Sequence, residues 1–287
     1  MMPFHKILFP VDFSAASEAM APYVQETAVR CSAQVTVMHS FDLVRGYNLA
    51  GHFNAACETE RLPIPYGPSM AKLRREEEEH LQTLIREQFP HVECSMIMED
   101  GDPADVIQGV AHRGRMDLIM MPTRGIGTFR RVLLGSTTAK VLHDVDCPVL
   151  TSVHELDPAA PHHADLRVIV CAVEVNDQAE TILKTAGLVA QAWGARLSIV
   201  HMIGSYLKML RTSSPDLDIG ALMRKCGVTG SIRALHEDVV EGIRRTAVEE
   251  SADLVIVGRG HDRGALSRLW SDLYEIVRES PCPVLSV

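Results

Sequence analysis

The sequence contains two copies of one α/β unit, and this internal repeat restricts the possible folds more than any other feature. Residues 7–39 align with residues 169–201 without a gap. Both segments have the pattern of a buried strand, an amphipathic helix and a second buried strand. The ends of the copies also correspond, because MDLIMMP resembles ADLVIVG and DCPVL resembles PCPVL. The repeat therefore predicts that the 287-residue chain folds into two domains with the same fold.

The strands of each copy are continuous apolar runs, such as QVTVMH and DLIMMP, and helical segments separate them. Runs of this kind are typical of strands buried on both faces, and their alternation with helices is typical of a parallel sheet. We therefore expect a doubly wound α/β fold in each half. The first domain is expected over residues 1–153 and the second over residues 167–287, with the Pro/Ala/His-rich residues 154–166 as the linker.

The first copy is longer than the second because of an extra segment at about residues 41–90. It contains a loop and then the sequence SMAKLRREEEEHLQTLIREQF, in which the leucines fall mainly on one face of a helix. We expect Ser69 to cap this helix, and we expect the run of four glutamates to form a solvated face.

The composition limits the partners and the location of the protein. With 28 basic and 37 acidic side chains, the formal charge is −9, which disfavours non-specific binding to nucleic acid or anionic membranes. No apolar run is long enough for a transmembrane helix, and the start MMPFHKILFPVDFS is unlike a signal peptide. The seven cysteines are scattered, as expected for reduced thiols. We therefore expect a cytoplasmic protein that binds neither nucleic acid nor membranes.

The sequence MPTRGIGTFRRVLLGSTTAKVLHDVDCPVL is the segment that best fits the chemistry of a binding site. Gly125 and Gly127 allow backbone amides to point inward, and Gly135 precedes a helix whose N-terminus favours an anion. Arg124 adds positive charge. These features suit a phosphate, although glycines that only turn the chain and a Ser136 that only caps the helix would give the same composition.

The spacing in this segment resembles the signature of the universal stress protein family, whose ATP-binding members carry G-x-x-G, nine further residues and then G-[S/T]. Here Gly125 is followed by the nine residues IGTFRRVLL and then by Gly135 and Ser136. The strand end PVDFS and the ending DCPVL also resemble the family pattern, and the resemblance extends over both halves of the chain. It implies an α/β fold of two tandem, doubly wound domains with parallel five-stranded sheets, of the HUP/Rossmann-like type.

The resemblance also implies a nucleotide site in the first domain. Asp12 would contact the adenosine. Pro10 and Val11 would line the base pocket, with Ser40 beside it. The residues expected around the loop and the phosphates are Met121, Pro122, Arg124, Gly125, Gly127, Gly135, Ser136 and Thr137. The alternative role for Asp12 is to cap the following helix, for which Ser14 competes.

The second copy departs from this pattern. With Gly258 taken as the first glycine, Ser271 and Asp272 replace the Gly-Ser pair; with one residue deleted, Trp270 takes the place of the later glycine. Both alignments put bulk or negative charge where phosphates would lie. Glu174 replaces the strand-end aspartate. We therefore expect that the second domain does not bind ATP in the manner of the family.

The expected function is that of a stress-response sensor or regulator that binds ATP, with AMP or ADP as alternatives and Mg²⁺ as a companion ion. Hydrolysis should be slow at most, because no general base is evident beside the expected phosphates. One alternative is an interaction module without nucleotide, favoured by Pro122, which replaces the first family glycine and lacks an N–H. The other is a weak nucleotide hydrolase that uses Asp12 and His39.

The expected ligand is an adenine nucleotide, and the two domains are expected to be partners of each other. Family members often pair through their last strand, so the two fused copies are expected to pair within one chain, with a homodimer as the alternative. His39 and His201 recur at equivalent strand ends, where we expect hydrogen-bonded structural residues rather than catalysts.

Overall fold

Each copy folds into strands that alternate with helices in a computed structural model, which describes residues 2–41, 68–123, 134–152, 165–174, 176–202, 219–235, 238–259 and 267–287. The first copy contains β1 (Lys6–Pro10), α1 (Ala15–Cys31), β2 (Gln34–Phe41), α3 (Pro68–Gln88), β3 (Cys94–Asp100), α4 (Pro103–Gly114), β4 (Leu118–Met121), α5 (Ser136–Asp144) and β5 (Val149–Thr151). The second copy contains β6 (Val168–Val173), α6 (Ala179–Trp193), β7 (Arg196–Met202), α7 (Ile219–Cys226), β8 (Ser231–Leu235), α8 (Val239–Glu249), β9 (Leu254–Val257), α9 (Ser267–Glu279) and β10 (Val284–Ser286).

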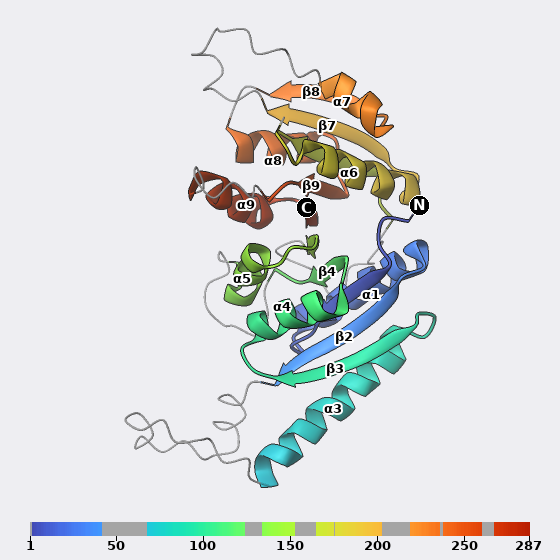
Figure 1. Cartoon of the computed structure of the whole chain (residues 1–287), viewed down its shortest axis with the longest axis vertical. Helices are drawn as coiled ribbons and strands as arrows, with labels where there is room; N and C mark the ends of the chain where they lie inside the picture. Colours follow the sequence, from blue (N-terminus) through green and yellow to red (C-terminus); the bar gives the residue numbers. More distant parts are fainter. Residues whose placement is uncertain are drawn as a thin grey trace.

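Each copy forms the parallel five-stranded sheet that was predicted, and the two sheets join edge to edge. The strand order across the joint sheet is β3-β2-β1-β4-β5-β10-β9-β6-β7-β8. All neighbouring strands are parallel except β5 and β10, which are antiparallel. Figure 1 shows the first copy in blue and green below the second copy in yellow and red, with the C-terminus between them.

The last strands of the two copies form the joint between the domains. Leu150 of β5 lies opposite Leu285 of β10. The Ser286 hydroxyl also crosses the joint and donates a hydrogen bond to the carbonyl of Val149 at 3.2 Å. The two domains therefore pair with each other through their last strands within one chain.

Helices cover both faces of the sheet. On one face α1, α3, α6 and α7 contribute to one continuous apolar core, and α4, α5, α8 and α9 contribute to a second core on the other face. Helix α1 shows why, since Met20, Val24, Ala28 and Cys31 recur at helical spacing and all are buried. None of the described helices is both long enough and apolar enough to span a membrane.

Helix α3 begins at Pro68, one residue before the expected cap. The prediction that Ser69 caps this helix is therefore wrong, because Ser69 already belongs to the helix. Proline suits the first turn, since the N–H that it lacks would have no partner within the helix. The apolar face is as expected, with Leu81 and Leu84 buried in the core.

The described cysteines have free thiols, as the sequence predicts; they are Cys31, Cys94, Cys147, Cys171, Cys226 and Cys282. Burial raises the pKa of Cys31, Cys94 and Cys147 to about 11. It raises the pKa of Cys282 to about 12. Thiols with such values form little thiolate near neutral pH and are weak nucleophiles, which fits a packing role.

Candidate functional site

The candidate site lies where β1 and β4 end side by side. Strand β1 pairs with β2 on one side and with β4 on the other, so the connections reverse direction at this point. Open parallel sheets bind ligands at such a switch, beyond the carboxyl ends of the strands. Pro10, Val11, Met121 and Pro122 occupy the two strand ends and are buried. Arg124, Gly125 and Gly127 lie outside the described residues, so their contacts stay predictions.

Asp12 follows β1 and is half-buried at the start of α1. Its Oδ1 accepts hydrogen bonds from the Ser14 backbone N–H at 3.1 Å and from the Ser14 hydroxyl at 2.6 Å. Ser14 is itself the N-cap, because its Oγ accepts the N–H of Ser17 at 3.2 Å. The cap is therefore Ser14, and Asp12 holds this cap in place while its carboxylate stays at the strand end.

Ser40 lies near the end of β2 and is half-buried. Its hydroxyl donates a hydrogen bond to the carbonyl of Gly101 at 2.7 Å. Because the single hydroxyl proton is used in that bond, Ser40 can only accept hydrogen bonds from a ligand.

The N-terminus of α5 lies beyond the end of β4, next to the same switch point. Gly135 is its N-cap, and among the described side chains none caps it. Helices α1, α4 and α8 differ, since Ser14, Asp102 and Asp238 accept hydrogen bonds from their first-turn amides. Of the first two helical residues, Ser136 is exposed and Thr137 is half-buried. Uncapped first-turn amides and the helix dipole favour an anion, so the geometry suits a phosphate.

Pro122 forms part of a tight joint between β4 and α5. The Thr138 hydroxyl donates a hydrogen bond to the Pro122 carbonyl at 3.1 Å, and the Gly135 N–H donates to the Thr123 carbonyl at 2.9 Å. The missing N–H of Pro122 thus removes one donor, while its carbonyl helps to fix the start of α5 beside the strand.

His39 connects the end of β1 to α3. Its Nδ1 lies 2.7 Å from the Val11 carbonyl, and its Nε2 lies 3.2 Å from Glu77 Oε2. The ring also packs at a tilt against Phe13, which in turn stacks on His80. The prediction that all four glutamates of α3 form a solvated face is therefore wrong for Glu77. With both ring nitrogens engaged, His39 has the structural role that the sequence predicts.

The counterpart of this histidine in the second copy makes the same contact. His201 Nδ1 lies 3.1 Å from the Val173 carbonyl, at the end of β6. The repeat therefore preserves the link between the second strand of each copy and the end of the first.

The second copy is tightly packed at Gly258. A side chain at Gly258, the counterpart of Pro122, would place its Cβ 2.5 Å from the Ile182 Cδ1 atom. Helix α9 begins at Ser267, so Trp270 and Asp272 lie within the helix rather than at its first residue. This differs from both sequence alignments, because the connection before α9 is shorter than the one before α5.

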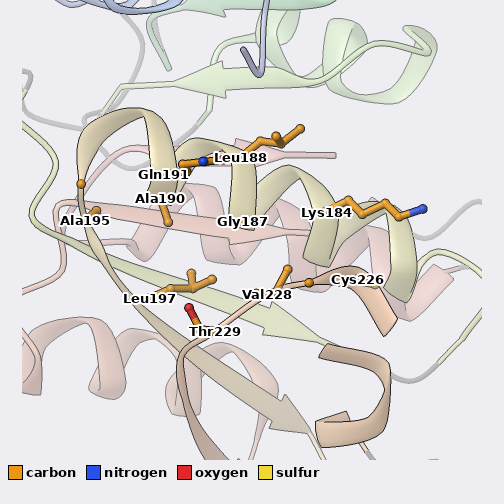
Figure 2. A pocket seen from close by; sticks show the side chains of 12 residues that line it. Lys184, Gly187, Leu188, Ala190, Gln191, Ala195, Leu197, Cys226, Val228 and Thr229 are labelled. Atoms are coloured by element: carbon orange, nitrogen blue, oxygen red, sulfur yellow. The ribbon is translucent and has the colours of Figure 1, made fainter. Parts of the chain in front are cut away.

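A cavity of about 650 Å³ lies elsewhere, in the second copy near the N-terminal ends of β7 and β8. Figure 2 shows it between α6 and the turn that joins α7 to β8, with Lys184, Gln191 and Thr229 around it. Helix α7, with 8 residues, is much shorter than its counterpart α3, with 21 residues. No predicted site residue lines this cavity, so it is separate from the candidate nucleotide site.

Comparisons with known proteins agree with this architecture. A model described as the universal stress protein family matches residues 3–152 and again residues 166–287. A universal stress protein of Thermus aquaticus is 27% identical over 147 residues, which cover 51% of this chain and 97% of that protein. A universal stress protein A-like protein of Arabidopsis thaliana is 34% identical over 74 residues, which cover 26% of this chain and 42% of that protein.

Among solved structures, a universal stress protein from Archaeoglobus fulgidus aligns with a TM-score of 0.69 over 99% of this chain and 96% of that chain. At 19% sequence identity, this likeness supports the fold alone.

Proposed function

Since the chain belongs to the universal stress protein family, we propose that its N-terminal domain binds ATP, or the related AMP or ADP, as a cytosolic stress-response sensor or regulator. The observation that carries the proposal is the N-terminus of α5, which no described side chain caps and which lies at the same sheet edge as Asp12. At this edge, the first-turn amides of α5 can bind phosphates, and the carboxylate of Asp12 can bind ribose hydroxyls. A nucleoside phosphate carries both groups, a phosphate and a ribose.

The phosphates would lie over Gly135, Ser136 and Thr137, and the adenosine would lie against the end of β1. Mg²⁺ would be held chiefly by phosphate oxygens, because the described residues contain no group of three metal-binding side chains. The chain's own residues would bind and orient the nucleotide. His39, with both ring nitrogens engaged, is not placed to act as a general base, so a sensor fits better than a fast enzyme.

The test is calorimetric titration of the full chain with ATP and Mg²⁺, comparing wild type with Asp12→Asn. Asparagine retains an Oδ1 that accepts both bonds from Ser14, so the turn is preserved while the charge is lost. One charge-assisted hydrogen bond is worth roughly 1.5–3 kcal/mol, so we expect binding to weaken about 10-fold to 100-fold.

Glu174→Gln is the matched control, because Glu174 is the counterpart of Asp12 in the second copy and is exposed. It should bind ATP as the wild type does. A wild type that takes up no ATP would reject the nucleotide site and favour an interaction module, and equal weakening by both substitutions would reject the assignment to the first domain.

A further inference from the structure

Arg259 is a buried cation that crosses the joint between the two copies. It follows β9 in the position that Thr123 occupies after β4. Its Nη1 donates a hydrogen bond to the Val145 carbonyl at 2.7 Å, and its Nη2 donates to the Cys147 carbonyl at 2.6 Å. The side chain is only 2% exposed, and its backbone N–H is bonded to the Val287 carbonyl at 3.0 Å. The second domain thus inserts a fixed guanidinium into the first.

The carbonyls that Arg259 contacts lie at the C-terminal end of α5. Val145 is the C-cap of this helix, and Cys147 follows it closely. The helix has nine residues, so its two ends are about 13 Å apart. Its C-terminus carries partial negative charge, which a cation stabilises, as its N-terminus favours an anion. Arg259 therefore holds one end of the helix whose other end is the proposed phosphate site.

Packing alone does not account for an arginine at this place. Burial lowers the pKa of the Arg259 guanidinium, and Nε has no hydrogen-bond partner among the described residues. In the part of the chain that the structure describes, the bonds that its side chain makes go to carbonyls and to no carboxylate. Apolar residues of similar volume are often as stable as buried charged groups, so stability alone does not require a charge at this position.

The corresponding described residues of the other copy make different contacts. In the second copy, Ser280 stands where Val145 does, and its hydroxyl donates to the Cys282 carbonyl at 2.7 Å. A side chain of the same copy thus satisfies the carbonyl that corresponds to that of Cys147. The N–H of Thr123, the counterpart of Arg259, donates to the Ser152 hydroxyl of its own domain at 3.3 Å. The joint is therefore asymmetric: the second domain reaches into the end of α5.

We propose that Arg259 is a positioning residue for the nucleotide site, supplied by the second domain and acting through α5 on the bound phosphates. This inference rests on the proposed function and gives the second domain a role in it. The domain that has lost its own phosphate loop fixes the position of the phosphate-binding helix in the other. The coupling concerns the phosphates and leaves the adenosine contacts at the end of β1 unchanged.

The test compares ATP with adenosine as ligands of Arg259→Met, using full-length protein with Mg²⁺. Coupling between sites commonly amounts to 5-fold to 150-fold, and we expect ATP affinity to fall about 10-fold. Adenosine affinity should change by less than about 2-fold, since adenosine at the end of β1 would make no contact with α5. Arg259→Lys keeps a cation that can reach one carbonyl and should give an intermediate loss.

Arg233→Met is the matched control, because Arg233 is an exposed arginine of the same domain that pairs with Glu249. It should change neither affinity. Amide hydrogen exchange in the wild type supplies a measurement that does not depend on variants. By reciprocity, ATP should slow exchange at the Val145 and Arg259 amides, and adenosine should not.

Equal loss of ATP and adenosine binding by Arg259→Met, or full ATP affinity in that variant, would overturn the inference while leaving the proposed function standing. An exchange rate of the Val145 amide that does not change when ATP binds would also overturn the inference and leave the proposed function standing. A wild type that binds no ATP overturns both proposals, so the two failures are distinguishable.

Discussion

Gly135→Asp is expected to abolish measurable ATP binding while leaving the fold slightly more stable. Gly135 has φ −61° and ψ 142°, which any residue adopts, so the substitution brings no backbone strain. An aspartate at this N-cap accepts the first-turn amides and complements the helix dipole, which stabilises the protein by a few tenths to about 1 kcal/mol. The same carboxylate occupies the proposed phosphate position and repels a triphosphate, so affinity should fall by about 100-fold or more.

Calorimetry with ATP and Mg²⁺, together with thermal unfolding, measures the two effects on one sample. Gln178→Asp is the matched control, because Gln178 is the N-cap of α6 in the second copy. It adds the same charge at a helix N-terminus and should leave ATP binding unchanged. A Gly135→Asp protein that unfolds at a higher temperature and still binds ATP at wild-type affinity would rule out α5 as the phosphate site.

Leu285→Ala is expected to destabilise both domains together by about 3 kcal/mol, in the range for a buried leucine truncated to alanine. Leu285 is 1% exposed and lies in β10, between β5 of the first copy and β9 of the second. Because one strand belongs to the cores of both copies, the variant should unfold in a single transition at a lower denaturant concentration.

Urea unfolding followed by circular dichroism checks this result. Leu150→Ala is the matched control, since Leu150 faces Leu285 across the joint but is only half-buried. It should cost less, on the order of 1 kcal/mol, because it buries less apolar surface. Two separate transitions, of which only one moves in Leu285→Ala, would show that the domains fold independently.

The fold was predictable from the sequence because the same pattern of strands and helices occurs twice in the chain. Continuous apolar strands, alternating helices and the matching DCPVL and PCPVL endings indicated two parallel sheets. The positions of Pro10, Val11, Asp12 and Met121 at neighbouring strand ends followed from the parallel order alone. Their contact with a nucleotide is still a prediction.

Long-range contacts were not predictable in this way. The bond between His39 and Glu77 joins residues on different elements, and a run of four glutamates gives no sign that one of them faces inward. Ser69 was a plausible cap by residue type, but the preceding Pro68 already adopts helical geometry. Local composition cannot decide between two adjacent residues that both suit a helix start.

The contact of Arg259 across the joint is the main structural feature that the sequence did not predict. In the sequence it appears only as part of GRGHDRG, a glycine-rich stretch without an intact phosphate motif. Its role depends on the antiparallel joint of β5 and β10, which brings the end of β9 close to the end of α5. A signal in the sequence was the unequal pair Thr123 and Arg259 at equivalent positions of the two copies.

The proposed function requires one nucleotide site per chain, in the first domain and not in the second. The most direct measurement is equilibrium dialysis of the full chain against labelled ATP with Mg²⁺, at saturating ligand and known protein concentration. We expect one ATP per chain, lost in Gly135→Asp and retained in Glu174→Gln. No bound ATP, or two ATP molecules per chain, would contradict the claim.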